Sequence, residues 1–535
     1  MNKYYTICWF ILWIALFGQP VRAQQSWQWV SNAQGASGNN VVLASDGLGT
    51  TIVAGNFTGT LTLGAFTLTS AGNSDIFVAW LSATGTWMQA VRAGGPGLDY
   101  LYSLALDGAK NPVVSGSFSG TSMFGSTTLT SAGGTDLFVA RLNASGTWTQ
   151  AVRAGGTDDE YAQQIAVDSN SNVVVTGAFY TNTIIGATTL LGAGAADVYV
   201  AWLSATGNWT QAVRAGGPAF DSASSIALDA AGNLTIAGYF NNSATFGSSV
   251  LVSAGNTDLF VARLNPAGSW VQAVRAGSTD SDYGSSVIVD GAGNATVTGY
   301  FYGTTQVGTQ ALTSAGLADI LVARLDAAGN WIQASRAGGP TLDVPGRLVS
   351  DSNGNVLVTG FFTGNADFGN TTLVSVGGRD IFLAALSPTG TWTQAVRAGG
   401  AGDDSGYDVV AGSNGSVIIG GLYTGNAAFG PYAITSNGTG AFVARFAGIA
   451  LATRPLSAVG AFSIAPNPAT TQVVIAWSRV VAEPQVLQVL DQLGHTVRTI
   501  LVPAYTSQIN ADVKDLSSGI YFVKSGVTVG RLQIK

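Results

Sequence analysis

The sequence has little of what many catalytic and metal sites require. Its 535 residues contain one cysteine and one histidine. Cys8 lies in an N-terminal apolar segment and His495 lies near the C-terminus, so residues 24–446 contain neither. This stretch therefore has no residue for thiolate catalysis, a disulfide, a histidine-based triad or a cysteine- or histidine-based zinc site.

Charge is also scarce. Only 10% of the residues are Asp, Glu, Lys or Arg, against about 25% in ordinary soluble domains. The formal net charge is -7, whereas binding to nucleic acid depends on clustered Lys and Arg. No internal run approaches the roughly 20 apolar residues of a membrane-spanning helix. We therefore expect no nucleic-acid partner and no transmembrane segment in the mature chain.

The N-terminus has the pattern of a secretory signal peptide. Lys3 precedes an apolar run over residues 7–17, which Pro20 interrupts before the small residue Ala23. The alternative, a retained membrane anchor, is disfavoured because this run is too short to cross a bilayer. The sequence predicts a signal peptide over residues 1–23 and a secreted or cell-surface protein.

The chain is rich in one long repeat. Its tryptophans are spaced by 60 residues once and by 61 afterwards, at Trp27, Trp87, Trp148, Trp209, Trp270, Trp331 and Trp392. Each repeat contains four short β-rich runs, here called A to D, which Gly, Asn and Pro turns separate. Tryptophan opens run D. Four strands in about 60 residues are typical of a propeller blade, since solenoid repeats usually have about 20 to 45 residues.

The two ends of the repeat region predict a closed ring. Sets of strands A, B and C occur seven times, and the last set ends at Phe446 without a following strand D. The missing strand is found at the other end, in residues 27–33. Joining the ends removes two free sheet edges. We therefore predict an all-β fold: a monomeric seven-bladed β-propeller over residues 24–446, with four-stranded blades and a ring closed by the N-terminal strand.

A further set of motifs recurs throughout residues 27–446: a G-G pair, an acidic residue, a hydrophobic-A-hydrophobic-D strand, G-N, and D-hydrophobic-F-hydrophobic-A. By these motifs the repeats resemble the seven-bladed beta-propeller (SBBP) repeat family. The resemblance implies the propeller fold and indicates no substrate.

The composition changes after the repeats. Residues 447–461 are expected to form a linker, and residues 462–535 alternate apolar and polar residues as in a small β-sandwich. Four motifs follow one another there: P-N-P, D-x-x-G, L-x-x-G-x-Y and a basic terminal strand. Their residues are Pro466, Asn467, Pro468, Asp491, Gly494, Gly519, Tyr521 and Lys535.

This succession resembles the type A C-terminal sorting domain of the type IX secretion system. The resemblance implies a Bacteroidetes-like source and the type IX secretion machinery as a partner. It further implies passage through the outer membrane, removal of the domain, and release or attachment at the cell surface.

One column of charges suggests structural ion pairs. In six repeats an aspartate opens strand C and an arginine follows 17 residues later in strand D. The pairs are Asp75 and Arg92, Asp136 and Arg153, Asp197 and Arg214, Asp258 and Arg275, Asp319 and Arg336, and Asp380 and Arg397. We expect the two positions to lie opposite each other across the strands. In the closure blade the corresponding residues are Ala441 and Asn32, so both charges are missing together. The alternative is an anion-binding ring.

A second acidic column lies in the loops from strand D to strand A. Its members are Asp99, Glu160, Asp221, Asp282, Asp343 and Asp404. We expect these carboxylates to face solvent around one mouth of the central channel, where they could bind Ca²⁺ or a basic partner. The favoured alternative is that each caps its own loop by accepting backbone N–H bonds. No other cofactor is expected.

Two further columns concern the connection between strands B and C. A glycine occupies one position in all seven copies and predicts a positive φ there: Gly64, Gly125, Gly186, Gly247, Gly308, Gly369 and Gly430. An aromatic residue ends strand B in each copy: Phe57, Phe118, Phe179, Phe240, Phe301, Phe362 and Tyr423. Tyr239, Tyr300 and Phe361 precede this position in three copies. We interpret these rings as core between blades, with stacking on sugars as the alternative.

These patterns favour a non-catalytic module that binds an extracellular glycan or protein, or that acts in adhesion. One alternative is a glycan-active enzyme, a hydrolase or lyase, which would use carboxylates of the D-to-A loops. The loops look too alike to give one acid a raised pKa and its partner an ordinary one. Another alternative is a purely structural surface protein.

Overall fold

The computed structural model describes residues 26–351, 353–447, 462–481, 485–491, 495–504, 506–525 and 528–535. The chain divides into two compact units, residues 1–451 and 452–535, and the boundary falls within the expected linker. The expected signal peptide and nearly all of that linker lie outside the described residues.

All regular elements in the described ranges are strands, apart from one 3-10 turn, η1 (Ser413–Gly415). Within these ranges no helix could cross a membrane. The all-β prediction is confirmed.

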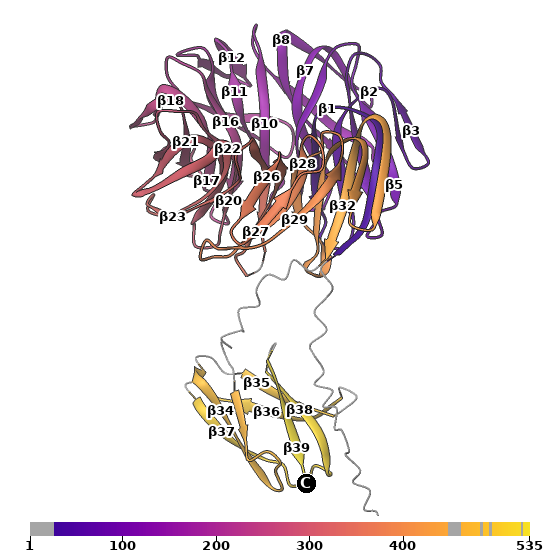
Figure 1. The fold of residues 1–535 in the computed structure, drawn as a ribbon, viewed down its shortest axis with the longest axis vertical. Coiled ribbons are helices and arrows are strands. Elements are labelled where there is room, and N and C mark those ends of the chain that lie inside the picture. The colour runs from indigo at the N-terminus through magenta and orange to yellow at the C-terminus, as the bar shows by residue number, and fades with distance from the viewer. Residues whose placement is uncertain are drawn as a thin grey trace, which may run out of the picture. The chain divides into compact units, whose positions relative to one another are not determined.

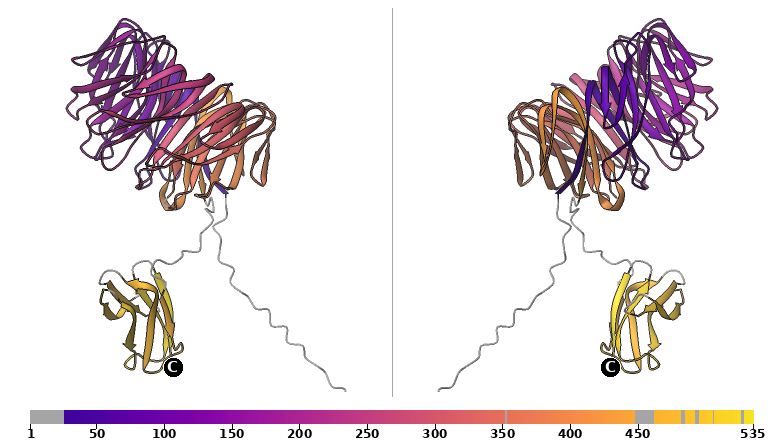
Figure 2. Two further views of the ribbon diagram at one scale, coloured as in Figure 1. Left: turned by 90° about the vertical axis from the view of Figure 1, so that its left-hand side faces the viewer. Right: turned by 90° about the vertical axis from the view of Figure 1, so that its right-hand side faces the viewer.

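The first unit consists of antiparallel sheets arranged about a common axis (Figures 1 and 2). One repeat forms a four-stranded sheet of β6 (Asp99–Leu106), β7 (Pro112–Phe124), β8 (Thr127–Leu142) and β9 (Trp148–Ala154). Three further sheets have the same order. They are β10 (Glu160–Val167), β11 (Val173–Phe179), β14 (Asp197–Leu203) and β15 (Trp209–Ala215); β16 (Asp221–Leu228), β17 (Leu234–Phe246), β18 (Ser249–Leu264) and β19 (Trp270–Ala276); and β20 (Asp282–Val289), β21 (Ala295–Val307), β22 (Gln310–Leu325) and β23 (Trp331–Ala337).

The remaining repeats are linked by hydrogen bonds into one larger sheet. Its path runs through β24 (Asp343–Ser350), β25 (Val356–Phe362), β28 (Asp380–Leu386), β29 (Trp392–Gly400), β31 (Val417–Phe429), β32 (Tyr432–Ala447), β1 (Ser26–Ser45), β2 (Thr51–Leu63), β4 (Asp75–Leu81) and β5 (Trp87–Ala93). Beside this path, β30 (Ser405–Ala411) pairs with β31 and β3 (Phe66–Thr69) pairs with β2. Two small hairpins complete the unit: β12 (Asn182–Ile185) with β13 (Thr188–Leu191), and β26 (Asn365–Phe368) with β27 (Thr371–Val374).

The two ends of the repeat region share a sheet. The start of β1 pairs with β32, with Trp27 opposite Phe446, and the end of β1 pairs with β2. Both views in Figure 2 place the indigo start of the chain beside the orange strands near residue 446. The first strands of the repeats also contact one another in turn: β1, β6, β10, β16, β20, β24, β30 and again β1. These contacts support the predicted closure, while the number of blades and the closed ring stay predictions.

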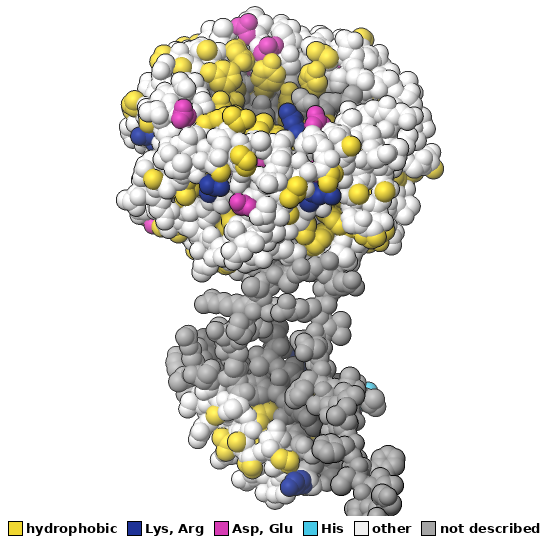
Figure 3. Space-filling model, in the orientation of Figure 1, with side chains coloured by type: hydrophobic (Ala, Val, Ile, Leu, Met, Phe, Trp, Pro, Cys, Tyr) yellow, Lys and Arg dark blue, Asp and Glu magenta, His cyan; other side chains and the backbone are white. Residues whose placement is uncertain are grey.

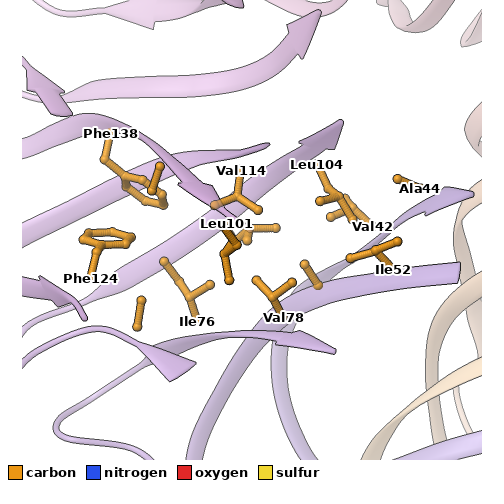
Figure 4. Close-up of a cluster of buried hydrophobic side chains, with 14 of the residues drawn as sticks. Val42, Ala44, Ile52, Ile76, Val78, Leu101, Leu104, Val114, Phe124 and Phe138 are labelled. Atoms are coloured by element: carbon orange, nitrogen blue, oxygen red, sulfur yellow. The ribbon is translucent and has the colours of Figure 1, made fainter. Parts of the chain in front are cut away.

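Neighbouring sheets pack face to face through buried apolar side chains. Figure 4 shows Ile52 and Val78, from β2 and β4, facing Leu101 and Val114, from β6 and β7. All four are at most 2% exposed. Complete burial of such a side chain contributes about 1.5–3 kcal/mol, so these interfaces supply stability that disulfides cannot supply here.

The repeated tryptophans connect neighbouring sheets. The indole Nε1 of Trp148 donates to the carbonyl oxygen of Arg92, at 3.1 Å, and Trp209 donates in the same way to Arg153, at 3.0 Å. The donor and the acceptor lie on the fourth strands of successive repeats. Six of the seven repeated tryptophans thus donate one hydrogen bond to the preceding repeat.

The connections from strand B to strand C are hairpins with a glycine turn. The seven predicted glycines have φ between +56° and +64°, which confirms the predicted backbone conformation. At Gly125 a Cβ atom would also lie 3.2 Å from the Cβ of Trp148. The turn therefore needs glycine for its dihedral angle and for the close approach of tryptophan.

The second unit is a small sandwich of two antiparallel sheets. One contains β33 (Phe462–Ala465), β34 (Gln472–Val481) and β37 (Thr506–Asp512). The other contains β36 (Thr496–Val502), β35 (Gln485–Leu490), β38 (Gly519–Ser525) and β39 (Thr528–Ile534). Val473, Leu487, Val523 and Leu532 are at most 1% exposed and form part of its core.

Three of its sequence motifs make turns or strand contacts. The side-chain oxygen of Asn467 accepts the Gln533 N–H at 2.8 Å, Asp491 accepts the His495 N–H at 2.9 Å, and the Tyr521 hydroxyl donates to the Ser517 carbonyl at 3.0 Å. Gly494 lies outside the described residues. These motif side chains therefore hold the sandwich together locally.

Candidate functional site

The six aspartates of strand C form ion pairs with the arginines of strand D. Asp75 pairs with Arg92, and the other five N–O distances are 2.5 Å for Asp136, 3.2 Å for Asp197, 2.5 Å for Asp258, 2.7 Å for Asp319 and 2.9 Å for Asp380. The aspartate side chains are at most 1% exposed, while the arginines are 29–39% exposed. A buried carboxylate needs such a partner.

The expected placement directly across the strands is wrong. The register sets Arg92 opposite Phe77, two residues beyond Asp75, so that the ion pair runs diagonally. The diagonal leaves Asp75 free to accept the backbone N–H of Ala71 at 2.9 Å. Each aspartate thus joins its own loop to the neighbouring strand, which is a structural arrangement with little access for an anion.

The second acidic column does not face solvent, and that prediction is wrong. All six carboxylates are at most 1% exposed: Asp99, Glu160, Asp221, Asp282, Asp343 and Asp404. Each accepts the backbone N–H of the residue four positions earlier, at 2.7–3.1 Å. The first strand of each repeat is called the inner strand below. The loop before it folds back over the acid, so each carboxylate caps its own loop, as the favoured alternative predicted.

Burial raises the pKa of these six acids. The pKa of Glu160 rises to about 8, those of Asp221 and Asp343 to about 7, and those of Asp99, Asp282 and Asp404 to about 6. Loss of hydration is the largest cause, and in all six repeats the aspartate of the ion pair adds repulsion. No group of three potential metal ligands occurs among the described residues. These carboxylates are poorly placed to meet Ca²⁺ or a basic partner.

A β-bulge recurs in the inner strand of six repeats. The register shifts three residues after the acid in β6, β10, β16, β20 and β30, and the corresponding shift in β24 spans two residues. The bulged residues are Tyr102, Gln163, Ser224, Ser285, Gly346 with Arg347, and Tyr407. Bulges re-aim side chains and are frequent beside binding sites.

These bulged residues line one cavity of about 330 Å³. Asn40 of β1 completes the set, so each of the seven mutually contacting inner strands contributes. Three more tyrosines line the cavity: Tyr239 on β17, Tyr283 on β20 and Tyr300 on β21. In the space-filling view, hydrophobic side chains, a class that includes tyrosine, gather in a hollow on the face toward the viewer, and charged side chains are sparse (Figure 3).

Arg347 departs from the repeat at this cavity. The corresponding residues in the preceding four copies are Ser103, Gln164, Ser225 and Ser286. In three of them the side chain accepts a backbone N–H of the next inner strand, at 2.8–3.1 Å. An arginine cannot accept a hydrogen bond. Instead, its guanidinium donates to the Tyr102 carbonyl oxygen, at 3.1 Å, and lies 3.4 Å from the Asp408 carboxylate.

Asp408 holds this arginine and the following strand together. One carboxylate oxygen accepts the N–H of Leu43 at 2.8 Å, and the other accepts that of Val409 at 2.8 Å. Burial raises the pKa of Asp408, while Arg347 and the two N–H bonds oppose the rise. The contact with Leu43 joins the last repeat to the first.

Three of the tyrosine rings that line the cavity contact one another. Tyr283 lies 4.8 Å from Tyr300, with ring planes at 22°, and 5.1 Å from Tyr239, with planes at 71°. All three are half-buried. Burial, followed by neighbouring tyrosines, raises the pKa of Tyr300 above its ordinary value, so its phenol keeps its proton.

The aromatic column at the end of strand B is core. Its seven rings are 0% exposed, which supports the core interpretation and excludes stacking on a sugar at those positions. Tyr239 and Tyr300, one residue earlier, line the cavity instead. The sequence singled out these two rings only as companions of the column, and Tyr102, Tyr407 and Arg347 were missed because they do not recur.

The comparisons with known proteins identify the second unit. Residues 463–531 match the secretion system C-terminal sorting domain. The tail is therefore a sorting domain of the type IX system, which supports export to the cell surface or secretion and interaction with that machinery. No curated protein matches the chain.

Several solved structures share a distant likeness. A fungal alcohol oxidase of the AA5 family, in complex with copper, has 13% identity and a TM-score of 0.43, over 96% of this chain and 99% of that one. YCF48 bound to D1 peptide has 11% identity and a TM-score of 0.35, over 77% and 92%. A gluconolactonase from Xanthomonas campestris has 12% identity and a TM-score of 0.29, over 61% and 93%. Such values carry no inference about activity or ligand.

Proposed function

We propose that this protein is an exported, non-catalytic propeller that binds an extracellular ligand in the tyrosine-lined cavity. One observation carries the proposal: residues from seven inner strands, far apart in the sequence, converge on a single cavity where Arg347 breaks the repeat. Ligand pockets typically combine aromatic walls with a few polar groups that fix orientation. The cavity has this composition.

The chemistry of the cavity favours binding over catalysis. Its lining consists of tyrosine, serine, glutamine, asparagine, glycine and one arginine, with no histidine, cysteine or acid. A glycan-active enzyme would need two carboxylates beside the substrate. The six acids at the starts of the inner strands are at most 1% exposed, so they are poorly placed for that role.

The proposal includes the route to the cell surface. A signal peptide over residues 1–23 directs the chain out of the cytoplasm, and the type IX machinery then recognises the sorting domain and removes it. We also propose that the repeats belong to the SBBP family and close into seven blades. A purely structural surface protein would share this route but would have no ligand in the cavity.

A glycan and protein array probed with residues 24–535 tests the proposal. We expect at least one ligand whose binding is lost in the double variant Tyr283→Ala with Arg347→Ala. Tyr432→Ala is the matched control, because Tyr432 is 38% exposed and lies on β32, outside the cavity. Binding that survives the double variant, or turnover of the bound glycan, would contradict the proposal.

A further inference from the structure

We infer that the ligand of this cavity is a neutral saccharide unit, whose ring lies against the tyrosines Tyr239, Tyr283 and Tyr300. The inference rests on the proposed function and adds the chemical class of the ligand. It is carried by the arrangement of the rings, by the polar groups between them and by the balance of charge.

The tyrosines form an apolar surface edged with hydroxyls. Tyr283 and Tyr300 stack nearly parallel, at 4.8 Å, and Tyr239 meets Tyr283 edge to face, at 5.1 Å. Because all three are half-buried, ring surface remains accessible from the cavity. A tyrosine has an apolar body and one polar tip. A pyranose has the matching form, with C–H groups on its faces and hydroxyls around its edge.

Several uncharged polar side chains in the cavity make no hydrogen bond within the described part of the chain. They are the Gln163 amide, the Ser224 and Ser285 hydroxyls, and the phenols of Tyr283 and Tyr300. Amides and hydroxyls both donate and accept, as do sugar hydroxyls. A site that presents such groups can select a hydroxylated ligand over an apolar one of the same size.

The charge in the cavity is already balanced. Arg347 is 21% exposed and lies 3.4 Å from Asp408, which is 5% exposed. The Arg347 guanidinium already donates hydrogen bonds to the Asp408 carboxylate and to the Tyr102 carbonyl oxygen. An anionic ligand would have to compete with a buried carboxylate for this guanidinium. The balance therefore favours a neutral sugar over a uronic acid or a carboxylate-terminated peptide.

The volume also limits the ligand. About 330 Å³ lies at the lower end of the roughly 300–1,000 Å³ typical of small-molecule pockets. Such a cavity suits a terminal saccharide unit rather than the interior of a long polysaccharide.

Titration calorimetry on residues 24–535 with glucose, galactose, mannose, N-acetylglucosamine and glucuronic acid tests the inference. We expect binding heat with at least one neutral sugar. The affinity should be the same at 50 and 500 mM salt, because a neutral sugar forms no ion pair with the protein. Tyr283→Ala should weaken that binding at least tenfold, Tyr283→Phe should weaken it less, and Tyr432→Ala should leave it unchanged. Melting curves verify that each variant is folded, and the phenylalanine variant retains the packing if the alanine variant does not fold.

The outcomes separate the ligand class from the proposed function. Preference for glucuronic acid with a steep salt dependence, or absence of heat with all five sugars, would overturn the inference. If the array then yields a protein whose binding the Tyr283→Ala and Arg347→Ala double variant abolishes, the proposed function stands without the saccharide. If no array ligand depends on the cavity, both fail.

Discussion

Replacing Glu160 with glutamine tests whether the buried acids of the inner strands are held in their protonated form. Glu160 is fully buried, and one of its oxygens accepts the Gly156 N–H at 3.1 Å. Its other oxygen, like one oxygen of Asp136, has no partner among the described residues. Both oxygens lie close to Gly155. A Cβ atom on this glycine would be 2.6 Å from the Glu160 oxygen and 2.8 Å from the Asp136 oxygen. A proton on Glu160 is therefore favoured.

The pKa gives the sign and the size of the effect. Burial raises the pKa of Glu160 from its ordinary 4.5 to about 8, although the hydrogen bond from Gly156 opposes the rise. Between these values the folded state binds a proton that the unfolded chain has released, so stability falls as the pH rises. At about 1.4 kcal/mol per pH unit, the loss is roughly 5 kcal/mol by pH 8.

Urea unfolding followed by tryptophan fluorescence, at pH 5 and pH 8.5, measures this loss. Glutamine carries no charge at either pH, so Glu160→Gln should resemble the parent protein at pH 5 and exceed its free energy of unfolding at pH 8.5. The matched control is Asp46→Asn. Although burial alone would raise the pKa of Asp46, hydrogen bonds from Leu48, Gly49 and Thr50 lower it, so this variant should lose stability at both pH values.

A variant that is less stable than the parent at pH 8.5 would refute the reasoning. So would a parent protein whose stability does not fall between pH 5 and pH 8.5.

Three other perturbations address the ends of the propeller, an ion pair and export. Deleting residues 24–34 removes the strand that pairs with β32 and should expose two sheet edges; size-exclusion chromatography should show aggregation, and a monomer with an unchanged melting midpoint would contradict closure. Arg397→Ala should cost about 2 kcal/mol in urea unfolding, because it leaves Asp380 buried without its partner; the double variant with Asp380→Asn should recover part of the loss, and additive losses would disprove coupling. Deleting residues 462–535 should leave a folded propeller in the periplasm by cell fractionation, and normal surface display would exclude the sorting role.

The elements that recur could be predicted from the sequence. The spacing of the tryptophans predicted the repeated strands, and the glycine column predicted the positive φ of the hairpin turns. Both were predictable because the same local conformation occurs in every repeat. The ion pairs were visible because Ala441 and Asn32 replace both charges together. The diagonal placement of each aspartate and its arginine could not be predicted, because the register depends on the bulges and turns of both strands.

The environment of the acids and the cavity itself could not be predicted. Spacing places Asp99 at the end of a loop, but its burial follows from the loop folding back so that Gly95 donates to it. The cavity depends on a bulge that re-aims Tyr102 and on strands more than 300 residues apart. Arg347 differs from the residues at the same position in the other repeats. A comparison that looks only for residues shared by the repeats therefore overlooks it.

The pairing of β1 with β32 has a consequence for the time course of folding. Trp27 is synthesised long before its partner Phe446, which lies at the end of the repeats. Contacts between residues so distant in the sequence form slowly, and until then the strand around Trp27 is an unsatisfied edge that can pair with the wrong neighbour or with another chain. Chaperone dependence and the yield of refolding should therefore be governed by this one late contact, while the internal repeats, whose strands are neighbours in the sequence, assemble early.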